Sequence, residues 1–215
     1  MPKPGGPEGL DHLAYLDAAI CQDVDRIRAL GARAGVGPDR LVALGGLAAL
    51  PLLQACRQRL GTRLPRDWTQ GYCPVCGAWP ALAEIRGLER ERHLRCARCG
   101  AGWRFDWLRC PFCGGGDHTR FEALVSEAHG ETRKVEACLS CRGYIKSVTS
   151  LQPWPPEQVL IEDAATVDLD VVALGHAFAR PDRAAVDVGV KVVPAGRSAG
   201  TTLSALGRRI PWLGR

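Results

Sequence analysis

The chain has 215 residues, of which 46% are hydrophobic and 24% are charged, as is ordinary for a globular protein of one large or two small domains. Its net charge of +5 lies in residues 180–215, where there are seven basic and two acidic residues, so the rest of the chain is neutral. The sequence contains no asparagine, which excludes an N-glycosylated secreted protein.

The N-terminal part of the chain has the apolar periodicity of helices. From Leu10 to Leu30 apolar residues recur at steps of three and four, which is typical of one face of an amphipathic helix. A second helical pattern covers residues 39–60 and predicts a break or kink at Pro51. We expect a helical N-terminal region over residues 1–68. Cys21 and Cys56 stand alone there beside apolar neighbours, and we expect both to be buried.

Residues 69–152 change to short segments separated by glycine-bearing turns. Six of these segments have the length and composition of strands, at residues 81–86, 92–96, 103–110, 121–128, 133–137 and 144–149. Strands this short do not bury enough apolar surface to fold by themselves. The region therefore needs an additional covalent or metal staple.

Four Cys-x-x-Cys pairs supply candidate ligands for such a staple. Two thiolates at this spacing on a tight turn can both face one metal ion at about 2.3 Å. Glycine follows the second cysteine of three pairs and permits a positive φ, and the fourth pair has Gly143 one residue later. The pairs are Cys73/Cys76, Cys96/Cys99, Cys110/Cys113 and Cys138/Cys141.

The gaps between the pairs favour sequential pairing. Nineteen residues separate the first pair from the second, which is within the range of zinc ribbons, and 24 separate the third from the fourth. A cross-brace, joining the first pair to the third, is the alternative. His93 and His118 are surplus to two complete sets, and we expect neither to be a ligand. The predicted sites are Cys73, Cys76, Cys96, Cys99 (site 1) and Cys110, Cys113, Cys138, Cys141 (site 2).

These sites predict two metal ions, each held by four thiolates. Tetrahedral thiolate suits both Fe and Zn, and the sequence does not separate them. A redox dithiol is the competing interpretation of Cys-x-x-Cys, but thioredoxin-like pairs open a helix after a strand, whereas these pairs follow strands and turns. Metal that only staples the fold is the simplest interpretation.

The predicted fold class is α+β, with two tandem rubredoxin-like or zinc-ribbon modules at residues 69–109 and 110–152. Residues 151–156 read as a rigid linker, and a helix is expected from 164 to 179, within a C-terminal helical region at 153–181. Its apolar face would carry Val167, Val171, Leu174 and Phe178. Residues 182–215 read as a basic, loosely ordered tail, in which 203–213 are candidates for docking.

The sequence predicts neither a membrane segment nor a signal peptide. No apolar run approaches the roughly 18 residues that cross a bilayer, and the N-terminus lacks an apolar signal core. We therefore expect a cytoplasmic protein without membrane contact.

Trp103, Phe105 and Trp107 alternate along one predicted strand, which places all three on one face. One interpretation is a core that locks the two modules together. The other is an exposed aromatic patch that binds a partner, since aromatic residues often dominate binding energy.

The order of these motifs resembles the formate dehydrogenase accessory protein (FdhE-type) family over residues 70–180. The matching residues are the eight cysteines with Leu94, Trp103-Arg104, Glu136 and Gly143-Tyr144-Ile145-Lys146, followed by the helical segment 163–180. The resemblance implies two rubredoxin-like modules, a cytoplasmic location, a requirement for active formate dehydrogenase, and contact with the catalytic subunit of that enzyme. The family usually has a longer helical N-terminal domain than the segment before Thr69.

The preferred hypothesis is an assembly factor without catalytic activity that binds the formate dehydrogenase catalytic subunit. A rubredoxin-like electron carrier or redox helper, and a nucleic-acid-binding zinc ribbon, are the alternatives. Residues 71–150 contain twelve basic and nine acidic residues, and eight thiolates with two divalent ions make the loaded modules slightly negative. Specific binding of nucleic acid needs a basic surface, so no specific nucleic acid is expected. Weak self-association is left open.

Overall fold

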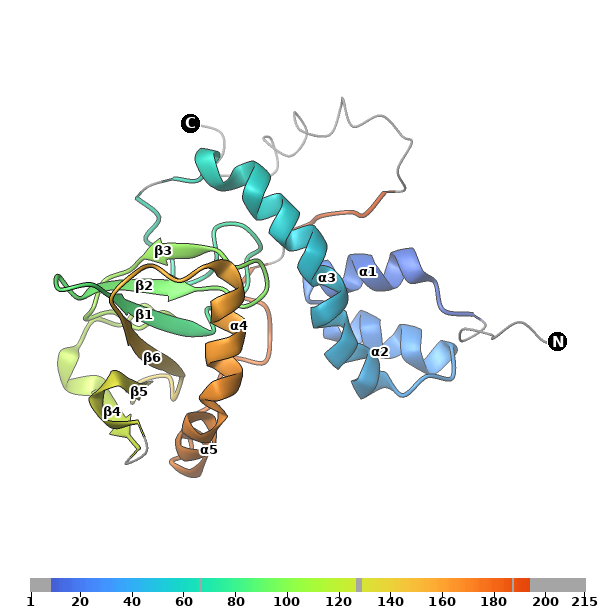
Figure 1. The fold of residues 1–215 in the computed structure, drawn as a ribbon. Coiled ribbons are helices and arrows are strands. Elements are labelled where there is room, and N and C mark those ends of the chain that lie inside the picture. The colour runs from blue at the N-terminus through green and yellow to red at the C-terminus, as the bar shows by residue number, and fades with distance from the viewer. Residues whose placement is uncertain (1–8, 66, 127–128, 187, 194–215) are drawn as a thin grey trace. The chain divides into compact units, whose positions relative to one another are not determined.

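The computed structural model describes residues 9–65, 67–126, 129–186 and 188–193, which form two compact units (Figure 1). Among the described residues, unit 1 comprises 9–48 and 188–193, and unit 2 comprises 49–65, 67–126 and 129–186. This division does not test the expected boundaries at 69, 110, 153 and 182, which stay predictions.

Unit 1 contains two short helices where the periodicity predicted one. These are α1 (His12–Cys21) and α2 (Val24–Arg33). Gln22 adopts a left-handed φ of 58°, and the Asp23 carboxylate accepts a hydrogen bond from the Arg26 N–H at 2.9 Å, which starts a new helix. The prediction was wrong because the apolar stripe keeps its period across the break.

The helices of unit 1 pack closely on the start of α3 (Pro38–Leu60). The Tyr15 hydroxyl donates to the Leu41 carbonyl at 2.7 Å in the buried interior. A Cβ atom added at Gly45 would lie 3.3 Å from the Ala19 methyl, so the absence of a side chain permits this approach.

The described start of the predicted tail is ordered against α1. The Val192 N–H donates to Asp17 at 2.8 Å, and the Cys21 thiol donates to the Val190 carbonyl at 3.3 Å. Cys21 is half-buried rather than buried. The remainder of the tail, including 203–213, lies outside the described residues.

Helix α3 continues through Pro51, which excludes the predicted break, whereas the alternative of a kink stays a prediction. Cys56 is exposed, so the expectation of a buried Cys56 was wrong. Helix α3 has 23 residues and contains an 18-residue window with a mean hydropathy of 1.3, so it is long and apolar enough to cross a membrane, contrary to the prediction from the sequence. One such helix is weak evidence for a membrane segment, because core helices of soluble proteins have the same length and composition.

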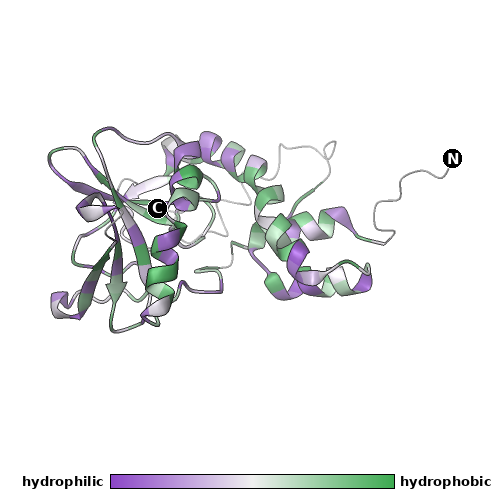
Figure 2. Cartoon of the chain, turned by 60° about the horizontal axis from the view of Figure 1, so that its bottom comes forward, coloured by the Kyte–Doolittle hydropathy of each residue, from purple (hydrophilic) through white to green (hydrophobic). Residues whose placement is uncertain are grey.

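Unit 2 is built on one six-stranded sheet with the order β3-β2-β1-β6-β5-β4. Hydrophobic and hydrophilic residues intersperse along its strands (Figure 2). The third expected strand, 103–110, is much shorter than predicted. The strands are β1 (Leu82–Arg86), β2 (Glu91–Arg95), β3 (Gly102–Arg104), β4 (Phe121–Val125), β5 (Arg133–Cys138) and β6 (Tyr144–Ser150).

The sheet joins two three-stranded modules. Within each module the strands are antiparallel, whereas β1 and β6 pair in parallel from Leu82↔Lys146 to Arg86↔Ser150. The helices, the sheet and the two four-cysteine clusters confirm the α+β class with tandem modules of zinc-ribbon type.

Two helices cover one face of the sheet where the sequence predicted a single helix from 164 to 179. They are α4 (Pro156–Ala165) and α5 (Val167–Gly175), and they are separated at Thr166, whose hydroxyl donates to the Glu162 carbonyl at 2.6 Å (Figure 1). Of the predicted apolar face only Phe178 is buried, and it lies beyond the end of α5. Leu169 and Ala173 are buried on α5 instead, whereas Val167, Val171 and Leu174 are exposed.

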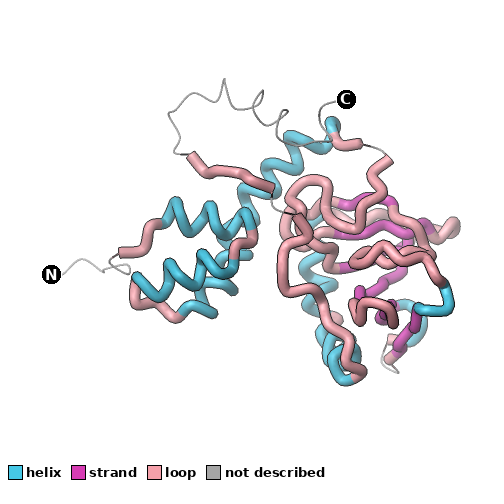
Figure 3. Tube along the Cα trace, turned by 180° about the vertical axis from the view of Figure 1, so that it is seen from behind, coloured by secondary structure: helices cyan, strands magenta, loops and turns pink. Residues whose placement is uncertain are grey.

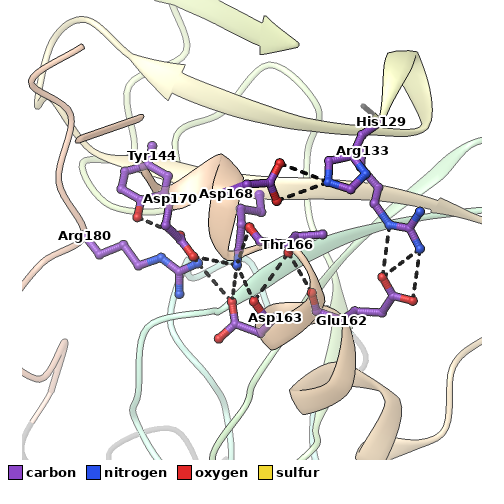
Figure 4. A network of polar contacts seen from close by, with 10 residues as sticks. His129, Arg133, Tyr144, Glu162, Asp163, Thr166, Asp168, Asp170 and Arg180 are labelled. Carbon is purple, nitrogen blue, oxygen red and sulfur yellow. Dashed lines mark hydrogen bonds and ion pairs between the residues drawn. The ribbon is translucent and has the colours of Figure 1, made fainter. Parts of the chain in front are cut away.

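Buried ion pairs fix α4 and α5 to the sheet (Figure 4). Lys146 of β6 is fully buried, and its ammonium group contacts Asp163 and Asp170 carboxylates at 2.8 Å each. Arg180 contacts the same two carboxylates at 3.1 and 2.9 Å. The Tyr144 hydroxyl donates to Asp170 at 2.7 Å. Each charge in this network therefore has more than one partner.

A second buried network lies between the modules, around Glu84 of β1. Its carboxylate binds Arg95 of β2 and Arg86, and accepts hydrogen bonds from the Ser150 hydroxyl at 2.9 Å and the Trp154 N–H at 2.8 Å. Burial by itself raises the pKa of Glu84. The hydrogen bonds and the two arginines lower the pKa by more than burial raises it, so it lies below its usual range. The carboxylate thus stays charged in the interior.

Loops cover much of the other face of the sheet (Figure 3). Trp103 and Phe105 are buried there, and the Trp103 indole donates to the Gln70 carbonyl at 3.1 Å. Phe105 lies 5.6 Å from the Arg92 guanidinium. Trp107 lies beyond the end of β3 and is 42% exposed, so the three aromatic residues do not share one strand face.

Replacing Lys146 tests the charge network. Lys146→Met leaves the Asp163 and Asp170 charges with less compensation, and we expect the free energy of unfolding to fall by about 3–5 kcal/mol. Denaturant unfolding of the metal-loaded chain measures this change. Lys134→Met, at a half-buried lysine on β5, is the matched control and should cost less than about 1 kcal/mol. Equal losses in the two variants would contradict the assignment.

Candidate metal centres

The four cysteine pairs fold into the same knuckle. In each one the N–H of the first cysteine donates to the carbonyl five residues later at 2.8–2.9 Å. The N–H four residues later donates back to the carbonyl of the first cysteine at 2.9–3.0 Å. The residue at that fourth position has a left-handed φ of 60–74° in every knuckle, at Gly77, Gly100, Gly114 and Arg142.

The fourth knuckle corrects the expectation for Gly143. Arg142, not Gly143, takes the left-handed conformation, with a φ of 60°. Gly143 is needed for space, because a Cβ atom there would lie 2.7 Å from the Phe112 ring. The Arg142 guanidinium lies 3.9 Å from the centre of the Phe178 ring, which holds this less favourable backbone in place.

Site 1 brings together Cys73, Cys76, Cys96 and Cys99, all of them buried. Their sulfurs lie within 4.8 Å of one another, with Cys73 to Cys99 at 3.4 Å and Cys76 to Cys96 at 3.5 Å. Four sulfurs about 2.3 Å from a central ion are about 3.8 Å apart in a tetrahedron. The arrangement therefore fits a tetrathiolate metal centre.

Site 2 brings together Cys110, Cys113, Cys138 and Cys141, also within 4.8 Å of one another. The sulfurs of Cys110 and Cys141 are 3.7 Å apart, and those of Cys113 and Cys138 are 3.9 Å apart. Cys113 and Cys141 are exposed, in contrast to every cysteine of site 1. Both clusters join consecutive pairs and not the first pair with the third.

The thiols in each cluster do not ionise independently. In site 1 burial and the neighbouring thiols raise the pKa of Cys73, whereas hydrogen bonds from the other three thiols lower the pKa of Cys96 well below its usual value. In site 2 burial by itself raises the pKa of Cys138. Hydrogen bonds from the Cys141 and Ser140 N–H groups outweigh this effect, so the pKa of Cys138 is lowered to about 7. A metal ion must displace the remaining protons, so its affinity rises with pH.

The two histidines near the knuckles lie outside both clusters. His93 contacts Arg86 through Nδ1 at 3.1 Å and Glu91 through Nε2 at 3.3 Å. His118 lies in the short helix η2 (His118–Arg120) and lines a cavity beside site 2.

An ion pair that no sequence pattern predicted connects the two modules. Arg92 of β2 donates to Glu136 of β5 at 2.8 Å and to the carbonyls of Asp106 and Arg109 at 2.9 and 3.4 Å. The two residues are 44 positions apart, and no local pattern connects them. The only sequence signal for this contact was that Glu136 is among the residues that resemble the FdhE-type pattern.

Comparison with known proteins matches part of the chain to FdhE proteins, although no family model matches it. A protein FdhE homolog of Stutzerimonas stutzeri is 33% identical over 114 residues, and one of Aquifex aeolicus is 29% identical over 119 residues. About half of this chain is therefore similar in sequence to part of the FdhE proteins.

The matched region covers 52% and 54% of this chain but only 36% and 41% of these two relatives. The chain thus spans less than half the length of the curated FdhE proteins that it matches. The crystal structure of the FdhE protein from Pseudomonas aeruginosa has a similar fold, with a TM-score of 0.55 and 22% identity, over 88% of this chain and 67% of that one.

Single cysteine substitutions test the two centres. We expect two metal ions per chain, and we expect both Cys96→Ser and Cys113→Ser to reduce the content to one, because each removes one of four ligands. Cys56→Ser, at an exposed cysteine outside both clusters, should leave two. Elemental analysis of freshly purified protein measures these contents. Loss of both ions from Cys96→Ser would indicate that the two centres are not independent, as in a cross-brace.

The difference in exposure predicts a difference in metal release. Cys96→Ser retains site 2, with its exposed Cys113 and Cys141, whereas Cys113→Ser retains the buried site 1. A chelator reaches exposed sulfurs first, so we expect Cys96→Ser to lose its remaining ion at least several-fold faster. The release is followed with a coloured metal indicator. Equal rates would show that exposure does not control release.

Proposed function

We propose that this chain is an accessory protein in the assembly of formate dehydrogenase and that it binds the catalytic subunit of that enzyme in the cytoplasm. The observation that supports this proposal is the similarity of about half of the chain to FdhE proteins, in a chain that also has two four-cysteine clusters. The chain would act before the enzyme is complete and would have no turnover of its own.

The chemistry of the two clusters is consistent with a structural role. Each cluster supplies four thiols to one ion, which fills a tetrahedral site and leaves no position for a substrate or an activated water. With closed centres, partner recognition depends on side chains elsewhere on the surface. In unit 2, Trp107 is the exposed member of the expected aromatic set.

An iron-containing electron carrier remains a second candidate, because one observation favours it. The exposed positions of Cys113 and Cys141 would give an electron a short path between site 2 and a partner. The metal content separates the two functions: ferric tetrathiolate is red, whereas a zinc centre is colourless and does not change its oxidation state.

Deletion of the gene tests the assembly function. Cells without this protein should make the catalytic subunit but show little formate oxidation, and the tagged chain should capture that subunit from cells in which assembly is under way. Isolated mature enzyme should work without the accessory protein. A requirement for the protein in each turnover of finished enzyme would contradict the proposal and favour the electron carrier.

Substitutions of the aromatic residues test the binding surface. Trp107→Ala removes a partly exposed ring, so we expect a small change in melting temperature and weaker capture of the catalytic subunit. Trp103→Ala, in the interior, should lower the melting temperature strongly. Leu88→Ala is the control, at a leucine that is 94% exposed, and should change neither property. Unchanged capture by Trp107→Ala would remove this residue from the proposed surface.

A further inference from the structure

The outward face of α4 and α5 is apolar and exposed. Both helices lie on one face of the sheet (Figure 1), where Val159 of α4 and Leu169 and Ala173 of α5 are buried. The opposite sides of the two helices therefore point away from the sheet. Five large apolar side chains are exposed on these outward sides, Leu160 and Ile161 of α4 with Val167, Val171 and Leu174 of α5.

Helix α5 is apolar on two opposite sides. Val167, Val171 and Leu174 are four and three positions apart, so they form one stripe along the helix, and they are 59–66% exposed. Leu169 and Ala173 form the other apolar side, which packs against the sheet. A helix with apolar residues on both sides is ordinarily covered on both sides. The helical period that predicted a buried stripe is thus present, but the sheet of the same chain does not cover it.

The carboxylates on either side of this stripe are paired within the chain (Figure 4). Asp170 contacts Lys146 and Arg180 at 2.8 and 2.9 Å. The Asp168 side chain is 45% exposed, but its carboxylate lies 3.1 Å from His129 Nε2. These pairs keep the negative charges of α5 at the margins of the outward face.

The rest of the outward face has no exposed charge. All residues from 158 to 179 are described, and every exposed one is Ala, Gly, His, Ile, Leu or Val. Glu157 bounds the face at the start of α4. Contact between this face and a second apolar surface would therefore bring no uncompensated carboxylate to the centre of the interface.

The size of the face is close to what a dimer needs. The five large side chains expose roughly 500 Å² of accessible surface, and the exposed alanines, Gly175 and His176 raise this to about 700 Å², whereas a specific interface buries about 800 Å² per partner. A twofold dimer places the same patch of both chains in contact, so each chain supplies this area. The face is therefore large enough for a weak dimer.

The composition of the face favours a second copy of the chain over other occupants. Partners of different sequence are selected largely by complementary charge, and this face has no exposed charge that would select one. An anionic lipid surface attracts lysine and arginine, which are also absent from the exposed residues between 158 and 179. In a twofold contact the face only has to match itself, and the stripe of one α5 can pack beside the same stripe of another.

We propose that the outward face of α4 and α5 binds a second copy of this chain and forms a weak symmetric dimer, in which the stripe Val167, Val171 and Leu174 packs against its counterpart. The inference goes beyond the proposed function and does not depend on it.

Analytical ultracentrifugation of the full metal-loaded chain tests the dimer. Between about 1 and 500 µM we expect a monomer–dimer equilibrium with a dissociation constant on the order of 10–100 µM. Leu174→Lys places a charge in the stripe of each copy and should weaken the dimer at least tenfold. Lysine forms helices well and suits the last turn of α5, so the melting temperature should change little.

Two further variants complete the measurement. Ile161→Lys, on the outward side of α4, should also weaken the dimer at least tenfold. Leu88→Lys makes the same change at a leucine that is 94% exposed in the turn between β1 and β2, and it should dimerise as the wild-type chain does. A wild-type chain that stays monomeric at every concentration, or an unchanged dimer in Leu174→Lys, would overturn the proposal.

Methyl NMR locates the interface directly. In a chain with labelled valine and leucine methyl groups, the signals of Val167, Val171 and Leu174 should shift with protein concentration along one binding curve, whereas those of Leu88 should not shift. Concentration-dependent shifts confined to residues outside α4 and α5 would place the dimer contact elsewhere and overturn the proposal.

Two results would assign the face to a different occupant and overturn the second copy. One is a monomeric chain that binds phosphatidylcholine vesicles and loses this binding in Leu174→Lys. The other is a monomeric chain whose capture of formate dehydrogenase is lost in Leu174→Lys. Failed capture by a wild-type chain that dimerises as expected would contradict the proposed function alone.

Discussion

Eight thiols held in two close tetrahedra are the constraint on which unit 2 depends. Its six strands have three to seven residues, and each knuckle precedes or follows a strand. Thiolates within 4.8 Å of one another repel unless a cation lies between them. A bound ion would replace this repulsion with attraction between the cation and the four sulfurs. A structural zinc contributes roughly 10–16 kcal/mol of apparent binding free energy at pH 7, which equals the whole stability of an ordinary domain. The ions would therefore determine whether the short strands pair at all.

The two clusters hold the ends of the strands, and buried charges fix the elements between them. Glu84 and Lys146 lie on adjacent strands, and their partners come from other strands, from α4 and α5 and from the segment after β6. Arg92 and Glu136 connect β2 of the first module with β5 of the second. A shifted register would leave one or more of these charges buried without a partner, at a cost of several kcal/mol each. The polar networks thus favour one arrangement of the two modules.

Local sequence patterns predicted where helices and strands lie better than they predicted which elements pair or pack together. The Cys-x-x-Cys spacing and the gaps between pairs are local, and the structure groups the cysteines in the sequential way. The parallel pairing of β1 with β6 connects residues about 64 positions apart, and no local pattern encodes it. The face of α5 was predicted wrongly because Val167, Val171 and Leu174 follow a helical period but point away from the sheet. Trp107 failed to follow the alternation of Trp103 and Phe105 because β3 ends at Arg104.

The two faces of the sheet are covered differently. The face toward α4 and α5 is closed by helices and ion pairs, whereas the other face has loop walls and a cavity beside the edge strand β4. Cys110 and Cys138 are ligands of site 2 and also line that cavity, and Arg92 binds both the carbonyl of Arg109, next to Cys110, and the Glu136 carboxylate. The shape of the cavity therefore depends on site 2. Because site 2 is the more exposed centre, loss of its ion would alter the wall that carries Trp107 before it disturbed site 1.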